Sequence, residues 1–556
     1  MIVTTIPLDT SNALVPASWP ETLLSSRLSG TTGTFIENTD LASNDTNLHT
    51  ELTGKLTPLT LTPVSVPKEY FGLNTGSNGK MKTLPMANFA YGLVRSHDNA
   101  GVTWQDIEGK IYTLVRVGNV VTARTSGYYD NVIRLGDIIT ISGVAEEGFN
   151  GEFTVTWKST SGNPSFQYIS PITLNTTATT ASMIMYTYWG HLDEWVTVNK
   201  VAGRQLIYTV YQVPEWAASN PSSSGPYGGR GWNTAPASQQ TLHNFITRVA
   251  NRYLLMGFII DYYEISNEPN YGTFYVGTKS SLAEQCRTVN LAVKSITPAS
   301  KIISPSLTDM ANQPATSTYF SDMIIASDNN GGTMAQWIDI VGIHLYGANT
   351  SIPLFISTLN NMMVTLGIAH LPIIDTENSA MSGRTTITIT NLVRVNNLVT
   401  ITLAGNHNLA NILFKDTAGY SGYVTYSESF TGNFKFNYVN ATTLTYHQIG
   451  PDETGTVFGV FQSSGLYGDT EFIKNIIQRA VIPACLGVIG QCGYSLGNPI
   501  DTLTITSNDT TPSARPEAMR VVTSIFNKII TYGISSANIL ANGTVVFTVN
   551  NVMYSF

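Results

Sequence analysis

The chain has 556 residues, enough for several domains, and 42% of them are hydrophobic, which supports a large core. Charged residues make up only 12%, against about 25% in an average protein. The formal net charge is −8 and no Lys/Arg cluster is present, which excludes a nucleic-acid-binding role. We also expect no membrane insertion, because no run is long and apolar enough to cross a bilayer. Ser, Thr, Asn and Gly replace the missing charges, which suits secreted, virion-associated or carbohydrate-handling proteins.

The N-terminal segment, residues 1–66, is rich in Thr, Ser, Leu and Pro and has weak periodicity. We expect it to form an arm or a small attachment segment. Its first residues show no basic stretch followed by an apolar one, so we expect no signal peptide. A protein of this kind would leave a cell by another route, such as assembly into a particle or lysis.

From residue 67 onward, strand and helix patterns alternate, as in βα units. The predicted strands are 70–74, 91–96, 205–211, 257–265, 301–304, 338–344, 372–376 and 482–489. The predicted helices are 239–253, 281–295, 353–366, 470–481 and 515–530. Eight strands with helices between them predict an α/β fold, a (β/α)₈ TIM barrel.

Two segments interrupt this alternation and resemble each other. Residues 114–122 read LVRVGNVVT and residues 392–400 read LVRVNNLVT, so they differ at only two of nine positions. Further on, 149–153 (FNGEF) matches 430–434 (FTGNF). Both segments alternate and are rich in Thr, Val and turn residues, which predicts two copies of a small antiparallel β module.

The modules follow predicted strands 2 and 7, so both should lie on the barrel face that carries active sites. There they would wall a cleft or hold a polymer; alternatively, they are assembly contacts or spacers. The expected organisation is an arm (1–66), a first barrel segment (67–108), module 1 (109–187), a second barrel segment (188–383), module 2 (384–462), a third barrel segment (463–532) and a C-terminal β segment (533–556).

The most informative motif is Asn267-Glu268-Pro269, which directly follows the apolar, aromatic run 257–265. A buried strand would carry Glu268 to its C-terminal end, and the proline would force the chain into a loop. Barrel enzymes place catalytic groups at that end. A turn after an ordinary strand would give the same three residues, so the motif needs a partner.

That partner is Glu377, which ends a second short apolar strand. Cleaving a glycosidic bond requires two flanking carboxyl groups, one to protonate the leaving oxygen and one to attack the sugar or activate water. Two strand-end glutamates far apart in sequence meet if both strands belong to one closed barrel. Taken alone, Glu377 could equally be a surface salt-bridge residue.

Cysteine and histidine patterns indicate no metal or disulfide framework. The three cysteines, Cys286, Cys485 and Cys492, are an odd number; Cys485 and Cys492 could pair, but we favour buried free thiols. No Cys/His spacing typical of a zinc site occurs. We therefore expect neither a metal nor an organic cofactor.

Aromatic residues near predicted loop ends are candidate platforms for sugar rings, whose apolar faces pack on aromatic faces. The candidates are Trp104, Trp216, Trp232 and Tyr271. For Trp104 and Trp216, packing in the core is an equally good interpretation. Trp232 follows a Gly-rich stretch, which favours an exposed loop.

Over about 70–530, with the modules removed, the chain resembles the retaining glycoside hydrolases of clan A, near families 39 and 5. The resemblance lies in six stretches: 93–108 (with LVRSHD and TWQDIE), 192–195, 208–216, 264–270, 341–346 and 375–377. It implies a (β/α)₈ enzyme with Glu268 as acid/base and Glu377 as nucleophile. Asn267 resembles the residue that binds the sugar 2-hydroxyl, and Arg95, His344 and Tyr346 resemble residues that orient the nucleophile or contact sugar.

The two modules resemble small β domains of bacteriophage tail proteins. Together these likenesses imply a retaining, endo-acting enzyme of a virion (phage tail) or of the extracellular space that degrades a bacterial capsular or exopolysaccharide. Its expected partners are the polysaccharide, other tail proteins and further copies of itself in a homo-oligomer. The alternatives are a non-catalytic glycan-binding tail protein or adhesin, an exported cellular glycosidase, and a purely structural tail component.

Overall fold

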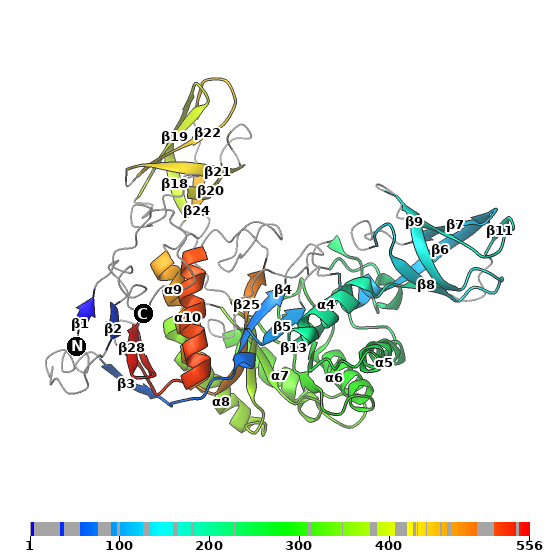
Figure 1. The fold of residues 1–556 in the computed structure, drawn as a ribbon, viewed down its shortest axis with the longest axis horizontal. Helices are drawn as coiled ribbons and strands as arrows, with labels where there is room; N and C mark the ends of the chain where they lie inside the picture. The colour runs from blue at the N-terminus through cyan, green and yellow to red at the C-terminus, as the bar shows by residue number, and fades with distance from the viewer. Residues whose placement is uncertain are drawn as a thin grey trace.

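The computed structural model describes much of the chain. The described residues are 2–4, 34–37, 56–75, 91–96, 101–125, 133–159, 165–178, 183–225, 228–308, 314–346, 349–378, 386–405, 420–425, 430, 432–440, 442–455, 459–463, 469–496, 516–540 and 544–556. They form a central barrel, two small β modules and a terminal sheet (Figure 1).

Eight parallel strands form the barrel, which confirms the predicted fold class. In chain order they are β4 (Phe71–Thr75), β5 (Leu93–Ser96), β13 (Gln205–Val210), β14 (Tyr262–Ile265), β15 (Lys301–Ile303), β16 (Val341–Leu345), β17 (Ile373–Asn378) and β25 (Val488–Leu496). Successive strands pair from β4 to β15 and from β16 to β25, and β25 pairs with β4, so β15 and β16 are the two ends of the sheet. Parallel bridges Ile303↔Ile340 and Leu307↔Ile343 close the ring between β15 and β16.

Helices surround the barrel between successive strands. They are α4 (Gly190–Val201), α5 (Gln239–Leu255), α6 (Lys279–Lys294), α7 (Pro314–Ile324), α8 (Ile352–Thr365), α9 (Asp469–Cys485) and α10 (Pro516–Tyr532), with the short α3 (Trp104–Ile107) after β5. Among the described residues, no helix has the length and apolar character needed to cross a membrane. Helix α6 begins at a cap in which the Thr278 hydroxyl accepts the Ser281 N–H, a common helix start.

Two strand predictions need correction. The eighth strand is not 482–489, because residues up to Cys485 continue α9 and the strand begins at Val488. Gly487, with φ of +87°, ends the helix between them. Strand β14 begins only at Tyr262, because Gly257, with φ of +80°, terminates α5 and a loop follows. Helices α4 and α7 were not among the predicted helices.

Each module closes into its own small barrel. Module 1 contains β6 (Glu108–Val117), β7 (Val120–Thr125), β8 (Ile138–Ser142), β9 (Gly151–Lys158), β10 (Ser165–Ile169), β11 (Thr176–Thr177) and β12 (Ile184–Thr187). Module 2 contains β18 (Thr386–Val395), β19 (Leu398–Leu403), β20 (Tyr420–Thr425), β21 (Gly432–Asn440), β22 (Thr443–His447), β23 (Glu453–Gly455) and β24 (Gly459–Ser463). The strand orders β11-β6-β12-β8-β9-β10-β7 and β23-β18-β24-β20-β21-β22-β19 are equivalent, and in both modules the first two strands also pair.

The modules also share internal contacts and have separate cores. The guanidinium of Arg116 lies over the Phe149 ring at 4.5 Å, and Arg394 lies over Phe430 at 4.6 Å. Each module has a hydrophobic cluster of its own. Module 1 is inserted after β5 and module 2 after β17, so both leave the barrel from the C-terminal ends of its strands.

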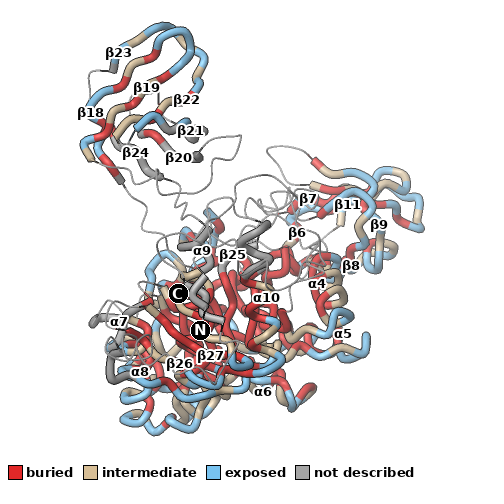
Figure 2. Tube along the Cα trace, turned by 60° about the vertical axis from the view of Figure 1, so that its left-hand side comes forward, coloured by how far each residue is buried: buried red, intermediate tan, exposed pale blue. Residues whose placement is uncertain are grey.

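Strands from the two ends of the chain share one antiparallel sheet. Its order is β1 (Ile2–Thr4), β2 (Thr34–Glu37), β28 (Val552–Ser555), β27 (Val545–Val549), β26 (Ser536–Leu540) and β3 (Leu56–Leu61). The predicted arm therefore supplies strands to the C-terminal β segment, while most of residues 1–55 lie outside the described residues. Phe547 and Tyr554 of this sheet belong to the same hydrophobic cluster as Phe71 of the barrel. Buried segments concentrate in the interior of the barrel region, and exposed segments lie on its outside (Figure 2).

The inside of the barrel is layered because side chains alternate along each strand. An apolar layer contains Leu93, Ile207, Ile303, Ile340, Ile374 and Cys492, with Tyr262 packed against it. Two residues further along the same strands lie Arg95, Thr209, Glu264 and Thr376, all buried. The barrel interior thus changes from apolar to polar toward the strand ends that carry Glu268 and Glu377.

Candidate active site

Glu268 leaves strand β14 through an unusual backbone turn. Ser266 has φ of 62° and Glu268 has φ of 43°, both in the left-handed region that non-glycine residues seldom adopt. The Ser266 N–H donates to the Val210 carbonyl and the Glu268 N–H to the Ser306 carbonyl, each at 3.0 Å. Neighbouring strands therefore hold this backbone in place, and such stored strain is typical of functional sites.

Glu377 reaches the site through an irregularity in strand β17. Ile343 pairs with Asp375 but His344 pairs with Glu377, so Thr376 has no partner on β16. The Asp375 carboxylate accepts the Leu345 N–H at 3.1 Å, which occupies a backbone donor where the register slips. Burial raises the pKa of Asp375 to about 7, although the hydrogen bond from Asn378 opposes this. A bulge of this kind redirects a side chain, here Glu377.

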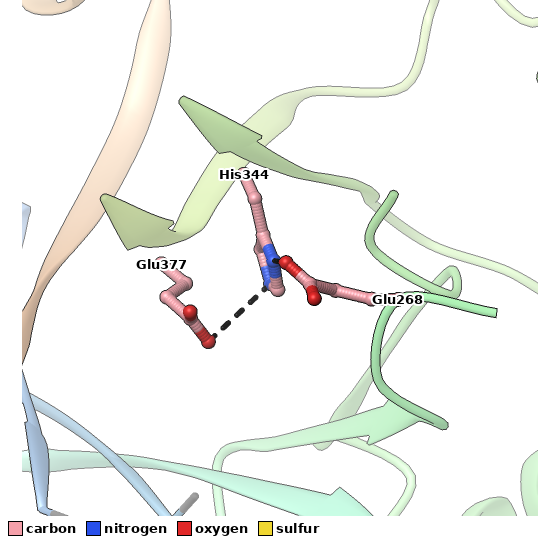
Figure 3. A group of neighbouring side chains, drawn as sticks. All are labelled: Glu268, His344 and Glu377. Carbon is pink, nitrogen blue, oxygen red and sulfur yellow. Dashed lines mark hydrogen bonds and ion pairs between the residues drawn. The ribbon is translucent and has the colours of Figure 1, made fainter. Parts of the chain in front are cut away.

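The two glutamates face each other across His344 (Figure 3). His344 Nδ1 lies 2.8 Å from Glu268 Oε1, and His344 Nε2 lies 4.0 Å from Glu377 Oε2. One donor atom from each of the three residues lies within 4.8 Å of the others. Glu268 is 9% exposed and Glu377 is 5% exposed. The site therefore brings two nearly buried carboxyl groups to the same small volume.

Arg95 connects the strands that carry both glutamates. It is fully buried, and its Nη1 donates to Glu377 Oε2 at 2.8 Å. Its Nη2 donates to Asn267 Oδ1 at 2.7 Å, and its Nε donates to Glu264 Oε2 at 2.7 Å. Burial disfavours the charge of Arg95, yet Glu264 and then Glu377 raise its pKa above the ordinary value. The guanidinium is therefore a permanent cation at the base of the site.

Both oxygens of Glu377 accept hydrogen bonds. Tyr346 donates its hydroxyl to Oε1, and Arg95 donates to Oε2. A carboxylate held by a cation and a phenol is stabilised in its ionised form. Glu268 instead contacts the imidazole of His344, where either group can carry the shared proton. The two carboxyl groups therefore have different surroundings, which is how one site can hold an anion and an acid together.

Glu268, His344 and Glu377 could in principle hold a metal ion, since their donor atoms converge. The neighbouring charges oppose it. Arg95 occupies one oxygen of Glu377 at 2.8 Å, and its positive charge would repel a second cation. These residues therefore fit a metal ion poorly.

Trp104 lies in the core, which is one of the two interpretations that the sequence left equally open. Its ring is 1% exposed and stacks on Phe245 of α5 with centroids 5.0 Å apart. Its indole N–H donates to Glu108 at 3.0 Å. Trp216, half-buried, meets Trp104 edge-on at 6.0 Å and donates to the Glu108 carbonyl at 3.2 Å. Glu108 is the first residue of β6 and forms an ion pair with Arg248 of α5. Both rings therefore stabilise the point at which module 1 joins the barrel.

The other two aromatic candidates differ in exposure. Trp232 is 4% exposed, and the backbone of Gly229 lies directly against its ring, so it does not occupy the exposed loop position expected for it. Tyr271 is 56% exposed and lies three residues after Glu268, with its N–H donating to the Glu268 carbonyl at 2.9 Å. Tyr271 therefore remains a candidate sugar platform beside the acid.

Glu264 is the main site residue that the sequence analysis missed. It is fully buried and its pKa is lowered: burial raises it, but Arg95, His344, Thr376 and Ser306 together outweigh burial. Asn74 also belongs to the cluster and accepts from Arg95 at 3.2 Å. The available signal was a charged residue inside an otherwise apolar strand, two positions before Ser266.

No family model matches the sequence, and no curated protein matches it. Among solved structures, the chain is similar to a glucosidase from Croceicoccus marinus (11% identity, 65% of this chain and 57% of that chain, TM-score 0.37). It is similar to a GH39 β-xylosidase from Caulobacter crescentus (10% identity, 88% of this chain and 77% of that chain, TM-score 0.43). It is also similar to a GH30 endoxylanase from Clostridium papyrosolvens (11% identity, 72% of this chain and 97% of that chain, TM-score 0.30). The matched region spans less than two thirds of the glucosidase chain.

Proposed function

We propose that the protein is a retaining glycoside hydrolase that cleaves a bacterial surface polysaccharide. The observation that carries this proposal is the buried carboxyl pair, with an oxygen of Glu268 and an oxygen of Glu377 within 4.8 Å. Retaining enzymes keep their two carboxyl groups about 5–5.5 Å apart, whereas inverting enzymes leave about 6.5–9.5 Å for a water molecule. The short separation supports direct attack on the sugar by one carboxylate.

In the first step, Glu377 attacks the anomeric carbon while Glu268 gives its proton to the leaving oxygen. The glycosidic bond breaks and a glycosyl ester forms on Glu377. In the second step, the Glu268 carboxylate takes a proton from water, and the water oxygen attacks the anomeric carbon and releases Glu377. The contacts of Arg95 and Tyr346 with Glu377 support its role as the anion, and His344 beside Glu268 supports a group that gains and loses a proton.

A polymer is the favoured substrate because both modules leave the barrel at the strand ends that carry the glutamates. The likeness of the modules to phage tail domains and the low charge content support a virion-associated or extracellular protein that acts on a capsular or exopolysaccharide. Such a protein would work alone, as a homo-oligomer, or together with other tail proteins. Exposed Tyr271 beside Glu268 would stack on a sugar of the leaving chain. Asn267, held by Arg95, would bind the sugar 2-hydroxyl.

The test is reducing-end release from a panel of bacterial capsular and exopolysaccharides. The wild-type protein should release new ends from at least one polymer, and Glu268→Gln and Glu377→Gln should lose this activity while remaining folded. Glu284→Gln, on helix α6, is the matched control and should keep it. Early products followed by proton NMR should retain the anomeric configuration of the substrate.

Binding to a polymer without new reducing ends would instead support a non-catalytic glycan-binding protein on the same barrel. Wild-type activity in Glu377→Gln would contradict the assignment of the nucleophile. Inverted early products would contradict the double displacement even if both glutamates proved essential.

A further inference from the structure

Glu264 is a buried carboxylate that the proposed reaction does not use. It lies on strand β14, in the polar layer inside the barrel beneath Glu268 and Glu377, and it has no exposed surface. Its Oε1 accepts from Thr376 at 2.6 Å and Ser306 at 2.7 Å, and its Oε2 accepts from Thr209 at 2.8 Å. These hydroxyls come from three other strands or strand ends, so the barrel itself fixes the position of this anion.

The fourth donor to Glu264 is Arg95, which also serves Glu377. Arg95 Nε meets Glu264 at 2.7 Å and Arg95 Nη1 meets Glu377 at 2.8 Å. The planar guanidinium holds these two directions at a fixed angle, and Nη2 is occupied by Asn267. One positive charge is therefore divided between two carboxylates on different strands.

This division affects the reactivity of Glu377. If Arg95 interacted with Glu377 alone, the Glu377 anion would be stabilised more strongly and would be a weaker nucleophile. The other groups facing it are the hydroxyl of Tyr346, the imidazole of His344 and the carboxyl of Glu268. Asp375 and Cys492 are further titratable groups packed beside this cluster. Arg95 is the permanent cation in contact with Glu377.

We propose that Glu264 is a positioning residue that orients Arg95 and takes up part of its charge, and so keeps Glu377 a reactive nucleophile. The catalytic consequence rests on the proposed function, but the electrostatic relation among the three residues does not. Glu264→Gln separates the two effects of this residue, because an amide oxygen can still accept from Arg95 Nε while the negative charge is removed.

The experiment is a pH titration of the full chain labelled with ¹³C at the glutamate carboxyl carbons. Signals of Glu377 and Glu264 are assigned from Glu377→Gln and Glu264→Gln. We expect the titration midpoint of Glu377 to fall by about one pH unit in Glu264→Gln, because Arg95 then acts on Glu377 alone. An unchanged or higher midpoint would overturn the proposal.

Two controls separate charge from packing. Ser306→Ala and Thr209→Val remove neutral donors to Glu264 but keep its charge, so the Glu377 midpoint should not fall. An equal fall in these variants would contradict charge sharing. If Glu264→Gln does not fold, Glu264→Asp assigns the Glu264 signal instead, because it keeps the charge and removes one labelled glutamate carboxyl carbon. The wild-type titration then decides, since Glu264 must stay ionised at the pH where Glu377 takes up its proton. Titration of Glu264 at or above that pH would refute the proposal.

Activity on the polysaccharide that the wild type cleaves gives a separate result. In Glu264→Gln we expect kcat to fall at least tenfold and the acid limb of the pH profile to move to lower pH, whereas a merely structural role would leave that limb in place. A shifted midpoint with no cleavage by the wild type would refute the proposed function alone. Cleavage by the wild type with an unshifted midpoint would refute the role of Glu264 alone.

Discussion

Replacing Arg95 with methionine should destabilise the barrel more than any surface charge change. Methionine keeps the buried aliphatic length but removes the donors to Glu264, Glu377 and Asn267 at 2.7–2.8 Å. Glu264 and Glu377 then lose the cation that each of them contacts. Breaking a buried ion pair by removing one partner costs about 3–5 kcal/mol. That is a large share of the roughly 5–15 kcal/mol that stabilises a typical domain.

The cost should depend on pH in a defined direction. In the wild type, burial raises the pKa of Glu264 but Arg95 and its neighbours lower it further, so the net pKa lies below the ordinary value. Such an acid contributes stability above its unfolded pKa, about 4.3 for Glu, and loses it as the pH falls through the folded pKa. Without Arg95, the largest of the effects that oppose burial is lost, so Glu264 in the folded variant binds a proton more readily. The deficit of Arg95→Met should therefore be largest near pH 7 and shrink below about pH 4.

Urea unfolding followed by circular dichroism at pH 7 and pH 4 measures this deficit. Arg230→Met is the matched control, because Arg230 pairs with Glu215 on the surface with 62% and 26% of their side chains exposed. Such exposed pairs contribute only about 0.2–1 kcal/mol. A deficit for Arg95→Met no greater than that of the control, or one that grows toward acid pH, would refute the reasoning.

Three further outcomes are expected. Because the pKa of Asp375 is raised to about 7 in the folded protein, the free energy of unfolding of the wild type should fall as the pH rises from the unfolded pKa of Asp to about 7. In urea unfolding, Asp375→Asn should therefore lose less stability than the wild type between pH 5 and pH 7. Trp104→Ala should cost about 3–5 kcal/mol as a core truncation, whereas exposed Tyr271→Ala should keep the unfolding midpoint and raise KM for the cleaved polymer. Prolonged EDTA treatment should leave the rate unchanged, since Arg95 occupies the position of a cation; a loss restored by one added metal ion would contradict this.

Sequence alone predicts the barrel and the meeting of its two strand-end glutamates. Glu268 and Glu377 each follow an apolar run, and parallel strands present their C-terminal ends at one face of the barrel. The local sequence pattern is therefore enough to predict that the two carboxyl groups meet. The duplicated module is readable for a different reason. Residues that are the same in both copies mark the positions that the module fold requires. The structure gives the two copies equivalent strand orders, in agreement with this sequence comparison.

Other features depend on contacts that no local pattern contains. Residues 482–489 are apolar throughout, so helix and strand are indistinguishable there by periodicity, and Gly487 decides the boundary through its backbone conformation. Trp104 lies near a loop end in sequence, but its depth is set by Phe245 of α5, more than a hundred residues away. Glu264 gains its importance only when barrel closure brings Arg95, Ser306 and Thr376 around it.

The central claim is that Glu377 forms a covalent bond with the sugar while Glu268 handles the proton. The most direct test is mass spectrometry of Glu268→Gln after incubation with a glycosyl fluoride of the oligosaccharide that the wild type releases. Fluoride leaves without a proton from Glu268, while loss of the general base slows hydrolysis of the intermediate. We predict a glycosyl adduct on the peptide that contains Glu377 and none in Glu268→Gln/Glu377→Gln. An adduct on another residue, or one that persists in the double variant, would contradict the account.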